Sequence, residues 1–175
     1  SRSMPHPLKG LEEQNDGKKM IALSYIVHVA SHDDQVTAIN FVNRLREGGF
    51  DAYWVPVKIS KETGFYRVYL GRFANWEQAE RMVEILKKRK LGLYATAIPY
   101  PFALQVGEVA TLTEARALLV SLRKSGFSGL LLVSYDESAG GHYRVLVGAY
   151  KKAVNTTWML RKLEQSGYAG KLVSP

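Results

Sequence analysis

The sequence predicts an α+β protein made of two tandem units, each with the element order strand, helix, strand, strand, helix, strand. The first observation behind this prediction is an internal repeat. The segment Thr63–Phe73 (TGFYRVYLGRF) returns 77 residues later as Gly140–Tyr150 (GGHYRVLVGAY). A fixed internal period divides a chain into comparable structural units. We therefore expect a polar tail over residues 1–20, a first unit over residues 21–98 and a second unit over residues 99–175.

The second observation is the apolar periodicity within each unit, which changes between that of a strand and that of a helix. Apolar residues alternate over residues 25–30, recur with helical spacing over residues 38–45, and stop at Gly48-Gly49. Pro56 favours an edge position for the second strand. The remaining elements expected in the first unit, all repeated in the second, are strands over residues 53–59 and 65–70, a helix over 79–86 and a short strand over 93–98.

The third strand of each unit is expected to have two distinct sides. In the first unit the helix-facing side carries Tyr66, Val68 and Leu70, and the opposite side carries Phe65, Arg67 and Tyr69. Two helices cover only one face of a four-stranded sheet, so the opposite face is open. Functional residues are expected on this open face.

Composition limits the class of protein and its partners. The hydrophobic fraction of 46% and the charged fraction of 23% are those of a globular protein, and the absence of cysteine excludes disulfides and thiolate metal sites. No apolar run reaches the roughly 18 residues that span a bilayer, and residues 1–19 lack the apolar stretch of a signal peptide. Ser1-Arg2-Ser3 resembles a cloning remnant, and we expect an anchoring segment upstream. The net charge of +8 favours anionic partners, namely nucleic acid, anionic lipid or acidic wall polymers.

Two sequence elements, each present twice, carry a family resemblance. The first strands read Tyr25-Ile26-Val27-His28-Val29-Ala30-Ser31 and Phe102-Ala103-Leu104-Gln105-Val106-Gly107-Glu108, and the third strands contain Tyr66-Arg67-Val68 and Tyr143-Arg144-Val145. Over about residues 24 to 174 the chain resembles the SPOR domain of bacterial envelope and cell-division proteins. The resemblance implies two ferredoxin-like domains without catalytic activity or cofactor. It also implies binding to peptidoglycan, with a preference for glycan strands whose stem peptides have been removed, on the periplasmic or cell-wall side of the envelope.

The resemblance also implies which residues bind the glycan. By position they are His28, Ser31, Trp54 and Arg67 in the first unit and Gln105, Glu108, Leu131 and Arg144 in the second. His28 stands where the family has Gln, and the second unit lacks both the Ser and the aromatic residue. The candidates are therefore His28, Ser31, Trp54, Arg67 and Tyr69, with Gln105, Tyr135 and Arg144 as secondary candidates.

These residue types suit a sugar polymer with free carboxylates. Trp54 and Tyr69 would stack on the flat faces of sugar rings, while His28 and Ser31 would hydrogen-bond polar groups. Removal of stem peptides frees a lactyl carboxylate, which an arginine fork such as Arg67 receives in two parallel hydrogen bonds. If the second strand lies one residue out of register, Tyr53 takes the place of Trp54 on the open face.

The open face of the second unit is expected to be more apolar than that of the first. It is predicted to carry Ala103, Leu131, Val133 and Leu146 beside Gln105, Tyr135 and Arg144. An apolar patch of this kind fits another protein surface, which here is the first unit, a partner or a second copy. The second unit is therefore expected to be mainly structural.

Other functions remain open as alternatives. RNA binding on an open sheet is one, although the glycine-flanked aromatic signature of RNA-recognition motifs is absent. A purely structural or protein-interaction module is another. His28, His32, Asp33 and Asp34 lack a metal-ligand spacing, and no catalytic motif is present, so neither a metal site nor an enzyme is predicted. The run Lys87-Lys88-Arg89-Lys90 ends a helix, where cations interact favourably with the helix dipole or contact an anionic polymer.

Overall fold

The computed structural model describes residues 22–58, 60, 62–136 and 140–175, with side chains described for all of these except 135, 136, 140 and 141. The predicted tail lies outside the described residues. The chain divides into two compact units between Tyr100 and Pro101. Within the described ranges, no helix is long and apolar enough to span a membrane.

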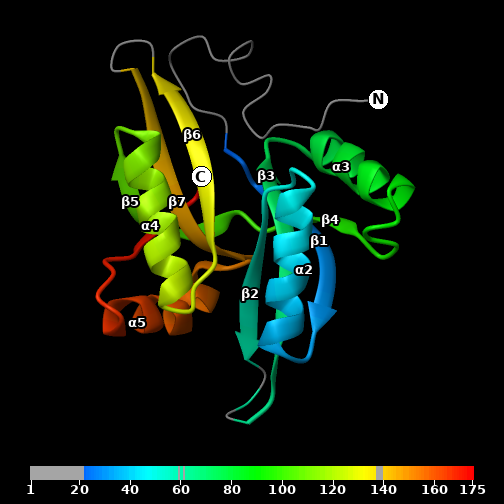
Figure 1. Ribbon diagram of the computed structural model, residues 1–175, viewed down its shortest axis with the longest axis horizontal. Helices are drawn as coiled ribbons and strands as arrows, with labels where there is room; N and C mark the ends of the chain where they lie inside the picture. The colour runs from blue at the N-terminus through cyan, green and yellow to red at the C-terminus, as the bar shows by residue number, and fades with distance from the viewer. Residues whose placement is uncertain (1–21, 59, 61, 137–139) are drawn as a thin grey trace. The chain divides into compact units, whose positions relative to one another are not determined.

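The first unit has the predicted element order and an antiparallel sheet (Figure 1). The strand order is β2-β3-β1-β4, so β2 lies at an edge, as Pro56 indicated. Its elements are β1 (Tyr25–His32), α2 (Gln35–Glu47), β2 (Ala52–Lys58), β3 (Gly64–Phe73), α3 (Trp76–Lys88) and β4 (Thr96–Pro99).

The second unit repeats this topology with the strand order β6-β7-β5-β8. One element differs from the first unit, because a short 3₁₀ helix precedes its last α-helix. Its elements are β5 (Phe102–Val109), α4 (Leu112–Lys124), β6 (Gly129–Asp136), β7 (Gly140–Tyr150), η1 (Ala153–Thr156), α5 (Thr157–Gln165) and β8 (Lys171–Val173). The predicted fold class, two tandem ferredoxin-like units, is confirmed.

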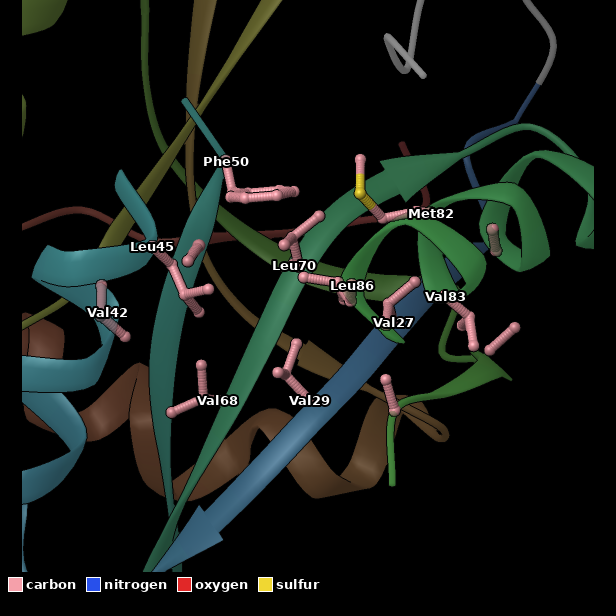
Figure 2. Close-up of a cluster of buried hydrophobic side chains, with 14 of the residues drawn as sticks. Val27, Val29, Val42, Leu45, Phe50, Val68, Leu70, Met82, Val83 and Leu86 are labelled. Carbon is pink, nitrogen blue, oxygen red and sulfur yellow. The ribbon is translucent and has the colours of Figure 1, made fainter. Parts of the chain in front are cut away.

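Each unit has one core between its helices and one face of its sheet. In the first unit, strand and helix residues converge in this core, and Figure 2 shows among them Val27, Val29, Val42, Leu45, Val68, Leu70, Met82 and Leu86. Tyr66 packs against this core and Tyr143 against the core of the second unit, as predicted. Side-chain caps begin the helices: the Asp34 carboxylate accepts from the Thr37 amide at 2.8 Å, and Asn75 does the same for Gln78 at 2.9 Å.

A glycine bulge shapes the third strand of each unit. Gly71 has φ +72, and the pairing with β1 gains one residue on β3 between Leu70 and Phe73. A β-carbon at Gly71 would lie 2.5 Å from the Phe73 ring, so both the backbone and the space require glycine. Gly148 repeats this arrangement with φ +79 beside Tyr150. The Gly-x-aromatic ending of both repeat copies is thus a structural feature.

The predicted facing of the second strand is wrong in both units. Trp54 pairs with Val68 and therefore shares its helix-facing side; it is 8% exposed and meets the Tyr66 ring edge-on at 5.9 Å. Tyr53, paired with Tyr69, takes the opposite face. The apolar pattern could not decide this facing, because β2 carries large apolar residues on both sides.

The same register applies to β6 in the second unit. Leu131 pairs with Val145 on the helix side, and Val133 pairs with Tyr143. The residues beside Leu146 and Arg144 on the opposite face are instead Leu130 and Leu132. The sheet face opposite the helices therefore carries Ala103, Leu130, Leu132 and Leu146, all 5% exposed or less.

Candidate functional site

A bulge in β1 brings His28 and Ser31 to the same face of the sheet. Residues three apart in a regular strand point to opposite faces. Here the pairing with β3 shifts between His28 and Ala30, so that His28 lies opposite Tyr69 and Ser31 opposite Arg67. The His28 Nε2 atom lies 3.0 Å from Ser31 Oγ. The bulge thus builds a polar cluster on the face away from the helices.

Histidine 28 is held in one orientation and favours its neutral form. Its Nε2 lies 3.1 Å from the Ala30 carbonyl oxygen; since that oxygen only accepts, we assign the hydrogen to Nε2 as donor. Burial, followed by the positive charge of Arg67, lowers the pKa of His28, and the bond to Ala30 opposes this less strongly. Neutral His28 leaves Nδ1 as a hydrogen-bond acceptor.

Arginine 67 is oriented by three aromatic residues. Its Nη1 donates to the hydroxyl oxygens of Tyr69 at 3.3 Å and Tyr100 at 3.1 Å. Its guanidinium carbon lies 5.4 Å from the centre of the Phe65 ring, a cation–π distance. Burial opposes the charge, yet the hydrogen bonds to Tyr69 and Tyr100 outweigh it and raise the pKa of Arg67.

No carboxylate compensates the charge of Arg67 within the described part of the chain. Its partners there are aromatic rings and hydroxyl groups, and its Nε is buried without a hydrogen-bond partner among those residues. Within the described residues, hydroxyl groups and an aromatic ring hold the Arg67 cation in place of a carboxylate.

Tyrosines 69 and 53 lie on the face away from the helices but do not present free rings. Tyr69 is 1% exposed, and its ring meets those of His28, Tyr53 and Tyr100 edge-on at 5.7–5.9 Å. Tyr53 is fully buried and its hydroxyl donates to the Gly71 carbonyl at 3.2 Å. Burial raises the pKa of both hydroxyl groups, which stay protonated. Tyr69 therefore helps to position Arg67. Its ring is buried and does not present the exposed face that the predicted stacking on a sugar requires.

Sequence reasoning did not assign Tyr100 to the site. A fully buried arginine places it: Arg72 Nη1 donates to the backbone carbonyls of Leu23 and Tyr100, each at 3.0 Å. This holds the Tyr100 hydroxyl against Arg67. Tyr100 follows the last strand and so has no strand periodicity that would have predicted its facing.

The second unit has an arginine at the same position, but its surroundings differ. Arg144 Nε donates to Gln105 Oε1 at 2.7 Å, and Gln105 Nε2 donates to Glu108 Oε2 at 3.4 Å. Glu108 Oε1 also lies 2.9 Å from His142 Nε2. Burial lowers the pKa of Arg144, against the opposing effect of the Glu108 charge. Arg144 is thus the end of a connected polar network.

Two positions distinguish the surroundings of the two arginines, because Gln105 stands where the first unit has His28 and Glu108 stands where it has Ser31. Glu108 is the counterpart of Ser31, and a matching bulge in β5, between Gln105 and Gly107, brings it to the face of Arg144. The second unit therefore supplies its own carboxylate, whereas the first unit supplies a neutral hydroxyl. The secondary candidates Gln105 and Arg144 are engaged with each other, and the side chain of Tyr135 lies outside the described residues.

The histidine and aspartate residues near the end of β1 do not converge. Asp34 caps α2, and its hydrogen bonds from Thr37 are the main reason why its pKa is lowered. The His32 ring meets Phe41 edge-on at 5.7 Å. No group of three or more metal-ligating side chains occurs among the residues that the structure describes.

Several solved structures resemble the chain at low similarity. A putative glycine cleavage system transcriptional repressor is 12% identical, with 86% of this chain and 96% of that chain covered and a TM-score of 0.24. The regulatory subunit of aspartate kinase from Thermus thermophilus is 15% identical, with 83% and 93% covered and a TM-score of 0.28. No curated protein sequence matches the chain.

A sequence family accounts for both units. The sequence model of the SPOR domain matches residues 24–99 and again residues 98–174. These matches cover most of the chain and coincide with the two ferredoxin-like units. SPOR domains are non-catalytic modules of bacterial envelope proteins that bind peptidoglycan. The chain therefore belongs to the SPOR domain family and contains two copies of this domain.

Proposed function

We propose that the first unit binds peptidoglycan glycan strands from which stem peptides have been removed, and that Arg67 receives the exposed lactyl carboxylate. The observation that carries this proposal is that no carboxylate pairs with Arg67 among the residues that the structure describes. Tyr69 and Tyr100 accept hydrogen bonds from Nη1, whereas Nη2 donates to none of the described residues, so we assign the incoming carboxylate to Nη2. In the second unit, Arg144 already donates to Gln105 and lies near the carboxylate of Glu108, so we do not assign a glycan carboxylate to it.

The neighbouring polar groups suit the rest of the ligand. Ser31 is exposed and offers a hydroxyl, and neutral His28 offers an acceptor. Sugar hydroxyl and acetamido groups need such directional partners. Since His28 is neutral, it adds no second positive charge, and the selectivity for a carboxylate depends on Arg67.

Paired arginine variants test the proposal. We expect Arg67→Ala to lose its preference for amidase-treated sacculi over untreated sacculi in a pull-down, because the carboxylate loses its partner. Arg67→Lys should restore the preference only in part, because a flexible lysine keeps the positive charge but not the planar guanidinium that Tyr69 and Tyr100 hold in place. Arg144→Ala is the matched control and should keep the preference. An undiminished preference in Arg67→Ala would show that another group recognises the denuded strand.

A second candidate function is a structural one for the second unit, carried by its apolar sheet face. Ala103, Leu130, Leu132 and Leu146 are each 5% exposed or less, so their side chains are buried in the folded chain and suit packing against protein better than binding a sugar. We expect Leu132→Asp to lower the urea midpoint of unfolding while the folded protein keeps its preference for denuded sacculi. A folded Leu132→Asp variant that no longer binds sacculi would instead place the glycan site on the second unit.

A further inference from the structure

The connection between α3 and β4, whose course is visible in Figure 1, is rich in positive charge and carries two exposed apolar side chains. Lys87, Lys88, Arg89 and Lys90 follow each other at the end of α3, and all four are exposed. Three residues further on, Leu93 is 70% exposed and Tyr94 is 89% exposed. We call Lys87, Lys88, Lys90, Leu93 and Tyr94 the basic tip.

The apolar part of the basic tip is held by an anchored turn. The Ala95 amide donates to the Gly92 carbonyl at 3.2 Å, so Leu93 and Tyr94 are the two central residues of this turn. Gly92 and Ala95 are buried, and a β-carbon at Gly92 would lie 3.2 Å from Val29 and from Ala95. Leu93 and Tyr94 are therefore exposed on a turn whose two ends are buried. Burial of these two side chains within the unit would have stabilised the fold.

The basic part of the basic tip includes a residue in a strained conformation. Lys90 has φ +56, the left-handed region that favours glycine. The other three α-helices of the described chain end with glycine at this place, namely Gly49, Gly126 and Gly167, with φ of 88, 88 and 89. The first unit keeps a cation where the local backbone favours glycine.

The second unit shows that the fold does not require the basic tip. The counterparts of Lys87 to Lys90 are Glu164-Gln165-Ser166-Gly167, and Gly170 stands at the position of Leu93. The exposed Lys171 stands at the position of Tyr94, so the second unit connects the same helix and strand without the lysine run and without counterparts of the Leu93 and Tyr94 side chains. Arg89 differs from its neighbours because its guanidinium lies 5.3 Å from the Phe50 ring, a contact within the unit.

We propose that the basic tip docks the first unit on the surface of an anionic phospholipid membrane. Lysine side chains beside an anionic bilayer are attracted to its surface charge, which explains three exposed lysines together. Leucine enters the boundary of the acyl chains, and tyrosine suits the headgroup level because its ring is apolar and its hydroxyl polar. A soluble anionic polymer would match the charge of the lysines but would not account for the exposed apolar side chains of Leu93 and Tyr94. This proposal does not depend on glycan binding.

Vesicle binding by the full chain tests the basic tip. The measurement is co-sedimentation with vesicles of phosphatidylglycerol and phosphatidylcholine in equal parts, compared with phosphatidylcholine alone. We expect binding to the anionic vesicles only. The variant Lys87→Gln/Lys88→Gln/Lys90→Gly should bind about a hundredfold more weakly, since each cation contributes roughly a factor of five at such a surface. The variant Leu93→Ser/Tyr94→Ser should also bind at least about tenfold more weakly, because it loses the inserted groups.

Matched controls separate this result from general charge effects and from loss of fold. Lys124→Gln/Arg161→Gln/Lys171→Gln removes three exposed cations of the second unit and should leave binding within about twofold. All variants should keep the preference of the parent chain for denuded sacculi. Equal losses in both triple variants would overturn the proposal in favour of diffuse attraction. Full binding by Leu93→Ser/Tyr94→Ser, together with binding to an anionic polysaccharide, would overturn it in favour of a wall polymer.

Discussion

At the scale of single residues, His28 links stability to pH. Its pKa is lowered in the folded protein, so the unfolded chain binds a proton on acidification before the folded chain does. The contribution of His28 is fully present above about pH 6.5, the ordinary pKa, and is lost as the pH falls toward the lowered pKa. We therefore expect the urea midpoint of unfolding to fall between about pH 7 and pH 5.

The variant His28→Gln isolates this effect, because it places at position 28 the residue found at the counterpart position 105. We expect the decrease in the urea midpoint over the same pH range to be smaller in this variant. The parent Arg67 remains in place, so only the titration of residue 28 is removed. An unchanged pH profile would show that other groups cause the acid sensitivity.

Lys90 provides a second test at the residue scale, on stability instead of binding. Lys90→Gly should raise the free energy of unfolding by roughly 0.5–1 kcal/mol, because glycine adopts the left-handed conformation without strain. Gly167→Lys should lower it by about 1 kcal/mol for the same reason. An added β-carbon at Gly167 meets no atom within 4 Å, so the cost there is conformational. Urea unfolding measures the free energy of unfolding of both variants. A lower value for Lys90→Gly would show that the backbone of Lys90 is not strained.

At the scale of elements, the register of β2 decides which aromatic residue belongs to the core. Trp54 packs with Val68 and Tyr66, so Trp54→Ala should lower the free energy of unfolding by about 3–5 kcal/mol. Trp54→Phe should cost less, because it keeps an aromatic ring in the core. We expect the folded Trp54→Phe protein to bind denuded sacculi like the parent chain. A variant that loses sacculus binding at unchanged stability would instead support the glycan-stacking role first predicted for Trp54.

The bulges act at the same scale and explain how the face is assembled. One bulge in β1 moves Ser31 to the face of His28, and another in β3 moves Phe73 into the core after Gly71. Each bulge changes the facing of every residue that follows it in the strand. A site built across such strands contains residues whose spacing in the sequence does not indicate a shared face.

At the scale of the whole molecule, the net charge of +8 makes salt dependence a test of function class. Binding to a denuded glycan through one arginine should weaken only modestly with salt. Binding to RNA through many phosphate contacts would fall by about 10³-fold or more between roughly 50 and 200 mM salt. We expect sacculus binding to persist at the higher salt concentration. A steep loss for sacculi, together with tight RNA binding at low salt, would favour the RNA alternative.

The two units have the same strand topology but different residues around the shared arginine. Both units place an arginine at the same point of the third strand, but Ser31 in one unit and Glu108 in the other leave those arginines in different electrostatic states. The α3–β4 connection differs in the same way from its counterpart in the second unit. Both proposed functional surfaces therefore rest on differences between the copies and not on their shared motif.

The sequence by itself determined the repeat, the order of the elements, the edge position of β2 and the facing of β3, because these follow from local periodicity and residue type. Tertiary structure alone decided the facing of Trp54, the placement of Tyr100 against Arg67 and the link from Glu108 through Gln105 to Arg144. The physical reason is that β2 is apolar on both sides and bulges change strand parity. Facing and charge compensation there depend on pairing between segments far apart in the chain.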